Sequence, residues 1–285
     1  MTQPPPKPEI PAVLSEIIDF KRSEVEAEIA STPMSQLESQ CKDTEPPRDF
    51  FASVVEHPRH ETMSVIAEVK RRSPSAGLIR PEYDQNEFDP ASIAQGYSDA
   101  GASAISCLTD QKFFGGHPAF INQIKQQVPL PVLRKDFIID PYQITQARAL
   151  NADAVLLIAE CLSDTQITDF IAQISNLHMT TLLEIHDRAN LDRVLPIIES
   201  APPKSTLLGI NNRDLTKMTT DLHHSINLMG HIPEHIPLVT ESGIRTREDL
   251  QTLKAAGLNI ALIGQHLMAT PNPGHALAEL LSPNR

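Results

Sequence analysis

The stretch from Ser64 to Gly77 reads S-V-I-A-E-V-K-R-R-S-P-S-A-G and joins a short strand to an abrupt stop. Valine and isoleucine favour a strand, whereas the Ser-Pro-Ser-Ala-Gly run that follows cannot continue one. Side chains alternate across a strand, so Glu68 and Lys70 project to the same face. A surface ion pair on an edge strand is the structural alternative. Because buried charges are costly to place for structure alone, this pair at the end of a buried strand indicates a functional site.

Beyond this stretch, short apolar runs alternate with amphipathic helical segments. Eight runs predict strands, at 65–69, 104–108, 131–133, 154–158, 181–185, 207–210, 237–239 and 260–263. Helices are predicted between them, at 90–100, 118–127, 141–150, 164–177, 187–199, 222–229, 246–256 and 272–281. Continuous apolar runs separated by helices are typical of a parallel sheet covered on its outer face. Eight such units in about 220 residues predict an α/β fold, a closed (β/α)8 TIM barrel.

A doubly wound open sheet is the alternative fold. No Gly-x-Gly-x-x-Gly follows any predicted strand, so nothing favours a dinucleotide-binding sheet. Gly101, Asn151 and Gly257 each lie just before a predicted strand, which fits helix-terminating turns at the stable end of a barrel.

The chain before the first strand differs in character from the barrel. Residues 1–11 carry five prolines and are predicted to form a disordered or extended lead. Residues 12–63 are predicted to be a helical extension, with helices near 11–30 and 34–41. This extension has too few apolar residues for a core of its own. We therefore expect it to pack on the barrel, which spans 64–285.

Composition narrows the class of protein. The chain has 285 residues, of which 40% are hydrophobic, and a formal net charge of −12. Such an acidic chain does not suit a nucleic-acid partner. Three cysteines without a Cys-x-x-Cys pattern suit a reduced cytoplasmic protein. No segment has the length of a membrane span, and the N-terminus lacks the features of a signal peptide, so we expect no membrane partner.

Polar residues follow the predicted strands at the barrel end where active sites are built. Helix capping is the alternative explanation, and Asp187 is expected to cap a helix. Capping does not explain charges at the turn from strand to loop, and we therefore expect a convergent pocket. The strand ends carry Glu68 and Lys70, Thr109-Asp110, Arg134-Lys135-Asp136, Ala159-Glu160, Glu184 and His186, Asn211-Asn212-Arg213-Asp214, Thr240-Glu241-Ser242-Gly243, and Gly264-Gln265.

The last two strand ends indicate a phosphate site. Small residues at Ser242-Gly243 and Gly264 leave backbone N–H groups accessible. The loops after strands seven and eight commonly bind phosphate in this fold. Such groups could hold an anionic ligand despite the acidic composition.

With these motifs in order, the chain resembles the indole-3-glycerol-phosphate synthase family over nearly its whole length. The resemblance rests on L-S-E-I-I-D-F-K-R-S-E-V-E (14–26), A-E-V-K-R-R-S-P-S-A-G (67–77), F-D-P-A-S-I-A (88–94), S-C-L-T-D-Q-K-F-F-G-G (106–116), V-L-R-K-D-F-I (132–138), A-D-A-V-L-L-I (152–158), L-L-E-I-H-D (182–187), G-I-N-N-R-D-L (209–215), T-E-S-G-I (240–244) and L-I-G (262–264). It implies a lyase of tryptophan biosynthesis. The implied substrate is 1-(2-carboxyphenylamino)-1-deoxyribulose 5-phosphate, which closes a ring and loses CO2 and water to give indole-3-glycerol phosphate.

The resemblance also implies roles for individual residues. Lys135 corresponds to the general acid that protonates the substrate carbonyl. Lys70 corresponds to the lysine that pairs with the departing carboxylate and with Glu68. Glu184 corresponds to the acid/base of the dehydration, with Glu68 and Asn211 positioning hydroxyls. The implied substrate-binding residues are Ser73, Ser242, Gly243, Gly264 and Gln265 for phosphate, Phe114, Phe137, Leu156 and Ile158 for the aromatic ring, Arg213 at the mouth, and Glu241 in the polar ring.

Elementary chemistry agrees with these roles. Carbonyl protonation needs a nearby cationic acid, and a desolvated lysine beside another cation is expected to have a lowered pKa. A flat aromatic substrate needs an apolar slot, which Phe114 and Phe137 could form. This chemistry requires no metal or redox cofactor. The eleven histidines have no His-x-His or His-Glu-x-x-His spacing, so no metal site is predicted.

Two other functions share parts of this pattern. Another sugar-phosphate barrel, such as phosphoribosylanthranilate isomerase or the tryptophan synthase α subunit, would share the phosphate loops. Such a barrel would not account for the presence of the Glu68 and Lys70 pair together with Lys135. An inactive barrel serving as a partner subunit would be expected to lose at least one of Lys70, Lys135 and Glu184. We expect a monomer that acts on a small molecule.

Overall fold

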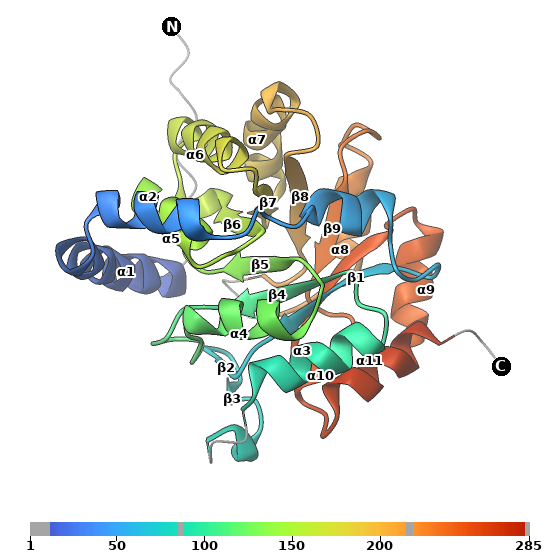
Figure 1. Cartoon of the computed structure of the whole chain (residues 1–285). Coiled ribbons are helices and arrows are strands. Elements are labelled where there is room, and N and C mark those ends of the chain that lie inside the picture. The colour runs from blue at the N-terminus through green and yellow to red at the C-terminus, as the bar shows by residue number, and fades with distance from the viewer. Residues whose placement is uncertain (1–11, 85–87, 215–218, 283–285) are drawn as a thin grey trace, which may run out of the picture.

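The computed structural model describes residues 12–84, 88–214 and 219–282. Within this part of the chain, eight parallel strands close into a barrel in the order β1-β10-β9-β8-β7-β6-β5-β4 (Figure 1). The prediction of a (β/α)8 barrel is confirmed. The lead predicted for residues 1–11 lies outside the described residues. The barrel strands are β1 (Ser64–Val69), β4 (Ala104–Leu108), β5 (Val132–Lys135), β6 (Ala154–Ile158), β7 (Thr180–Ile185), β8 (Thr206–Asn211), β9 (Leu238–Glu241) and β10 (Ile260–Ile263).

Helices surround this barrel and connect its strands. They are α3 (Pro90–Asp99), α4 (Ala119–Gln127), α5 (Pro141–Ala149), α6 (Asp164–Asn176), α7 (Arg188–Ser200), α8 (His223–Met229), α9 (Arg247–Ala255) and α11 (Pro273–Leu281). Shorter elements lie in the loops: a hairpin of β2 (Arg72–Ser73) and β3 (Gly77–Leu78), the 3-10 turns Pro81–Asp84 and Ala159–Cys161, and α10 (Gln265–Met268). Asp187 accepts a hydrogen bond from the Asn190 backbone, so its predicted helix cap is confirmed.

Three strands run further toward their C-terminal ends than the apolar runs indicate. Lys135, Asn211 and Glu241 are themselves the last strand residues. Lys135 pairs with Leu108 in the ladder, and Asn211 pairs with Glu241. Hydropathy marks only the apolar part of a strand, whereas backbone pairing extends as far as the neighbouring strand does. These side chains therefore project from the rigid barrel wall.

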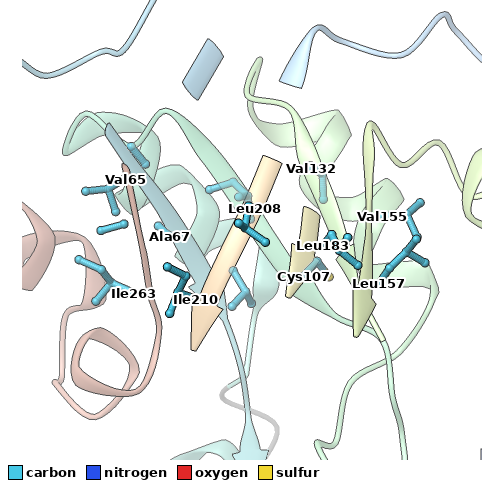
Figure 2. Close-up of a cluster of buried hydrophobic side chains, with 14 of the residues drawn as sticks. Val65, Ala67, Cys107, Val132, Val155, Leu157, Leu183, Leu208, Ile210 and Ile263 are labelled. Atoms are coloured by element: carbon cyan, nitrogen blue, oxygen red, sulfur yellow. The ribbon is translucent and has the colours of Figure 1, made fainter. Parts of the chain in front are cut away.

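The strands bury both of their faces in separate apolar clusters. Val65, Ala67 and Val69 belong to an outer cluster with residues of the surrounding helices, part of which Figure 2 shows. Ile66 belongs to an inner cluster that fills the barrel. Because side chains alternate across a strand, Glu68, which lies two residues after Ile66, also points toward the barrel axis. Other inner residues are Ala104, Leu133, Ala154, Leu156, Leu182, Leu207, Val239, Ile260 and Leu262.

Tight turns lie at the N-terminal ends of the barrel strands. Gly101 and Gly257 have φ of 91° and 99°, and Asn151 has φ of 68°. A left-handed residue just after a helix stops the helix and redirects the chain. The predicted helix-terminating turns are therefore confirmed.

The N-terminal segment runs from one end of the barrel to the other. It comprises α1 (Ala12–Ser31), α2 (Met34–Asp43) and a π-helical turn at Ala52–Glu56. Figure 1 shows α1 and α2 beside α5, and α2 packs on α5. The Arg48 side chain donates to the carbonyl oxygens of Lys125, Val128 and Leu130, before β5 begins. Phe50 and Val54 join the inner cluster of the barrel.

Candidate active site

A cavity of about 410 Å3 opens where the barrel strands end. All the residues that the resemblance assigns to the site line this cavity, although they come from all eight strand ends and the loops beyond. The structure therefore brings the assigned set together. Its members are Glu68, Lys70, Ser73, Phe114, Lys135, Phe137, Leu156, Ile158, Glu184, Asn211, Arg213, Glu241, Ser242, Gly243, Gly264 and Gln265. Some of the other polar strand-end residues do not line the cavity, namely Thr109, Asp110, Arg134, Glu160, Asn212 and Asp214.

The Lys135 ammonium lies among three carboxylates. Its Nζ is 2.7 Å from Glu241 Oε2, 3.3 Å from Glu184 Oε2 and 3.8 Å from Glu68 Oε2. The three glutamates are almost completely buried. Lys70, two residues after Glu68 in the chain, forms an ion pair with it. Two cations thus face three acids within a largely dry pocket.

This arrangement corrects the expectation for Lys135. Burial lowers the pKa of an ammonium, but Glu241, Glu184 and Glu68 more than offset burial and hold the pKa of Lys135 well above its ordinary range. The prediction of a lowered pKa is wrong because the sequence shows which charges exist but not how many converge on one lysine. Lys135 therefore carries its proton at any physiological pH.

The carboxylates themselves divide into two classes. Burial raises the pKa of Glu184, but Lys135 and His186 outweigh burial and bring it to about 2. Burial and the Glu184 charge raise the pKa of Glu241 to about 8, against the opposing effect of Lys135. Two close carboxyl groups cannot both ionise cheaply, so one keeps its proton. Of this pair, Glu184 is therefore the stronger acid and Glu241 the weaker one.

Hydrogen bonds orient the polar side chains at the rim. The Asn211 amide donates to Glu184 Oε1 at 3.0 Å, which fixes that carboxylate. The Arg213 guanidinium donates to Ser75 Oγ at 2.5 Å and to Gln265 Oε1 at 3.1 Å. Arg213 therefore joins the loops after β1, β8 and β10 across the cavity mouth.

One wall of the cavity is apolar. The rings of Phe114 and Phe137 are 5.9 Å apart and tilted by 41°. Leu14 and Ile17 of α1 line the same cavity. A planar ring could be held against this wall, with its polar substituents directed toward the lysines.

The opposite side is formed by the loops after β9 and β10. Ser242 and Gly243 both have left-handed backbone conformations, with φ of 70° and 89°. Gly264 lies so close to Glu68 that a Cβ there would collide with the carboxylate. Both loops fit an anion held by backbone N–H groups and by Arg213.

Several lining residues have no assigned role in the predicted site. His186, predicted only as one of the converging strand-end residues, lines the cavity beside Glu184, and the spacing Glu184-Ile-His186 is a usable signal because alternate strand residues share a face. Ser75, Thr220 and Arg245 also line it, with no comparable signal in the sequence. Gly209 does not line it but leaves room for Glu241, since a Cβ there would strike the Glu241 carboxylate.

The described residues contain no group of three or more His, Cys, Asp or Glu side chains that could hold a metal ion. The cavity nevertheless contains a cationic acid, paired carboxylates, an apolar slot and an anion-binding rim. This combination can bind a phosphorylated aromatic compound and move protons on it.

Comparison with known proteins agrees with this geometry. The family model for indole-3-glycerol phosphate synthase matches residues 14–280. An indole-3-glycerol phosphate synthase from Rhodopirellula baltica is 44% identical over 95% of this chain and 99% of its own length. One from Acidithiobacillus ferrooxidans is 41% identical over 94% of this chain and 98% of its own length.

Solved structures add a likeness of fold alone. A 3-hexulose-6-phosphate synthase from Salmonella typhimurium superposes with a TM-score of 0.58 at 13% identity, over 77% of this chain and 98% of that one. A phosphoribosylanthranilate isomerase from Thermotoga maritima superposes with a TM-score of 0.52 at 13% identity, over 76% of this chain and 96% of that one.

Proposed function

The chain belongs to the indole-3-glycerol phosphate synthase family, and on that premise we propose how its cavity carries out the reaction. The enzyme is a carboxy-lyase of tryptophan biosynthesis. It converts 1-(2-carboxyphenylamino)-1-deoxyribulose 5-phosphate to indole-3-glycerol phosphate by ring closure, decarboxylation and dehydration. The observation that carries the residue roles is the Lys135 ammonium among three buried glutamates.

In ring closure, Lys135 is the general acid. As the aromatic carbon attacks the substrate carbonyl, the carbonyl oxygen becomes an alkoxide that is more basic than an amine. A proton from the ammonium then moves downhill even though the pKa of Lys135 is raised by its carboxylate neighbours. The raised pKa keeps the acid protonated between turnovers. The same fixed cation stabilises the charge that develops on the oxygen.

In decarboxylation, Lys70 is the counter-ion of the departing carboxylate. Its partner Glu68 holds the ammonium in place, and the pKa of Glu68 is lowered by Lys70 and Lys135 in spite of burial. Loss of CO2 returns the pair of electrons to the ring and restores its aromaticity. Glu68 and Asn211 are positioned to orient the sugar hydroxyls.

In dehydration, Glu184 delivers a proton to the departing hydroxyl. Its Oε1 is already held by Asn211, which leaves the carboxylate correctly aimed. Substrate binding is assigned to the other lining residues. Ser73, Ser242, Gly243, Gly264 and Gln265 hold the phosphate with Arg213 nearby, the ring lies against Phe114, Phe137, Leu156 and Ile158, and Glu241 bonds to Lys135.

We propose a cytoplasmic monomer without a nucleic-acid partner. The net charge of −12 opposes contact with nucleic acids, and the three cysteines are free thiols. No helix in the described ranges is both long and apolar enough to cross a membrane. Light scattering on the purified chain would test the monomer.

The experiment that tests the mechanism follows CO2 release and indole fluorescence in parallel after mixing enzyme and substrate. Lys135→Ala should reduce kcat by about 10²–10⁴-fold and release no CO2, because ring closure is the first step. Glu184→Gln should release CO2 in one turnover and then stop before the indole forms. Lys204→Ala is the matched control, since Lys204 pairs with Glu56 at the surface and should keep full activity. If Lys135→Ala turns over within a few-fold of the parent, Lys70 becomes the first candidate for the acid.

A further inference from the structure

His186 lies behind Glu184, between two carboxylates. Its Nε2 is 3.4 Å from Glu184 Oε1, and its Nδ1 is 3.3 Å from Glu160 Oε2. The imidazole is only 10% exposed, and Glu160 is 7% exposed. Neither ring nitrogen has a well-aligned hydrogen bond among the described residues, and Glu160 Oε2 lacks one as well. Both nitrogens of this buried imidazole therefore lie near acids without being committed to a hydrogen bond with either one.

The surrounding structure fixes the position of this histidine. Its backbone N–H donates to Glu160 Oε1 at 2.9 Å, and its carbonyl oxygen lies 2.8 Å from His224 Nε2 on α8. Glu160 lies in the 3-10 turn that follows β6, whereas His186 follows β7 directly. The loop ends of two adjacent strands therefore fix the backbone of His186 beside Glu184.

The proposed dehydration creates a need for a proton at this point. Glu184 must donate a proton, yet its pKa is about 2, so the resting carboxylate has none to give. His186 holds one, because Glu160, Glu184 and Glu241 overcome the effect of burial and raise its pKa to about 8. Glu241 is the weaker acid of the pair and the rival proton source, but its Oε2 accepts a hydrogen bond from Lys135 at 2.7 Å. No lysine or arginine of the described residues pairs in this way with the His186 ring.

We propose that His186, oriented by Glu160, supplies the proton that Glu184 passes to the departing hydroxyl of the substrate. This inference rests on the proposed role of Glu184. The Nε2–H bond of His186 breaks as an O–H bond forms on Glu184. In the same step the C–O bond of the substrate breaks, and its oxygen takes that proton and leaves as water. The electrons of the adjacent C–H bond form the ring double bond, and the Glu184 carboxylate accepts the released proton and passes it to the neutral imidazole.

The charges around His186 set the pH dependence of this step. Glu184 faces it from β7, Glu160 from the turn after β6 and Glu241 from β9, while Lys135 lies on the far side of Glu184. His224 touches only its carbonyl oxygen. His186 is cationic below the raised value near 8 and neutral above it, so kcat should fall as the pH rises through about 8.

The test is the pH profile of kcat for His186→Gln and Glu160→Gln. In His186→Gln we expect kcat for indole formation to fall by roughly 10²-fold, with KM within a few-fold of the parent. The decline above pH 8 should disappear, and CO2 release in a single turnover should keep its parental rate. Glu160→Gln should move the decline to lower pH, since the imidazolium loses an acidic neighbour. Added imidazole should partly restore kcat in His186→Ala. Imidazole would not restore kcat if the substitution had only damaged packing.

His224→Gln is the matched control, because it removes an imidazole that touches the same strand end without meeting Glu184 or Glu160. It should keep the decline above pH 8. If His186→Gln retains that decline and Glu241→Gln loses it, Glu241 is the proton source and the inference is wrong. If CO2 release falls together with indole formation in His186→Gln, a role in dehydration is likewise refuted. Failure of the parent enzyme to form any indole would instead refute the proposed function.

Discussion

Lys135 and its neighbours show how charge balance governs single residues in this cavity. Lys70, Lys135 and His186 can provide three positive charges, whereas Glu68, Glu160, Glu184 and Glu241 could provide four negative ones. Because an uncompensated buried charge is expensive, a proton is taken up to remove such a surplus. Glu241, whose pKa is raised, takes up a proton most readily of these carboxylates. The ordinary pKa of a residue type therefore predicts little inside this pocket.

Gly264 offers a test of how tightly the carboxylates are packed. A Cβ added at Gly264 would collide with the Glu68 carboxylate. We expect Gly264→Ala to lower kcat at least about 10-fold by displacing Glu68 and its partner Lys70, and to cost about 1–3 kcal/mol of unfolding free energy. Steady-state kinetics and denaturant unfolding measure the two effects.

Gly230→Ala is the control for this change. No atom lies within 4 Å of a Cβ at Gly230, and the backbone φ there is −61°. This variant should keep parental kcat and stability. Parental kcat in Gly264→Ala as well would mean that Glu68 can move without consequence, contrary to the assigned role. A change confined to KM would indicate that Gly264 contributes only to phosphate binding.

Among the elements, α1 is attached to the barrel by a buried ion network. Lys21 Nζ is 2.9 Å from Asp110 Oδ2 and 3.0 Å from Asp136 Oδ1, and only 3% of its side chain is exposed. Burial opposes these charges, but the network holds the pKa of Lys21 above and that of Asp136 below their ordinary ranges. Asp136 follows Lys135 directly in the chain. The helix is therefore connected to the strand end that presents the proposed catalytic acid.

Replacing Lys21 tests this attachment. Lys21→Met keeps the length of the side chain but leaves Asp110 and Asp136 buried without that cation. Removal of one partner from a buried pair typically costs about 3–5 kcal/mol, and we expect a loss of unfolding free energy in that range. KM should rise as well, since Leu14 and Ile17 on the same helix line the cavity. Chemical denaturation and steady-state kinetics provide the measurements.

The unfolding free energy that Lys21→Met loses should also depend on pH. The folded-state pKa of Asp136 is lowered, so its contribution to stability is complete above its ordinary value of 3.8 and declines as the pH falls below it. Lys21→Met should weaken that acid-dependent decline. Arg22→Ala is the control, because Arg22 is 66% exposed and pairs only with Asp19 at the surface. Equal losses in both variants would contradict a specific role for Lys21.

At the scale of the whole molecule, the N-terminal extension contacts both ends of the barrel. Leu14 and Ile17 line the active-site cavity, whereas Arg48 binds carbonyl groups at the opposite end. The Arg48 backbone N–H also donates to Asp153 Oδ1 at 2.7 Å. Phe50 extends the inner cluster there. The two parts of the extension thus serve different purposes, one for the substrate and one for closure of the core.

Two truncations separate these purposes. Deletion of residues 1–45 removes α1 and α2 but keeps Arg48 and Phe50, so we expect a folded barrel of reduced stability with a raised KM. Deletion of residues 1–56 also uncovers the inner cluster, and this variant should aggregate or unfold. Circular dichroism, thermal unfolding and steady-state kinetics would compare them. Parental KM in the shorter deletion would mean that α1 does not contribute to substrate binding.

Local patterns in the sequence specify the barrel and most of its cavity. Continuous apolar runs specify strands buried on both faces, and alternation within 64–69 turns Glu68 inward. The strand-end rule then gathers Lys135, Glu184 and Asn211 at one mouth, because all parallel strands end on the same side. Periodicity and order are local properties of the chain, and for that reason they can be read without coordinates.

Only the tertiary structure decided the proton balance and the supporting contacts. The raised pKa of Lys135 depends on Glu68, Glu184 and Glu241, which are far apart in the sequence and meet only in the closed barrel. The position of His186 opposite Glu160 likewise depends on how two adjacent strand ends align. Electrostatic interactions depend on distance and burial in three dimensions, and neither quantity is fixed until the chain has folded.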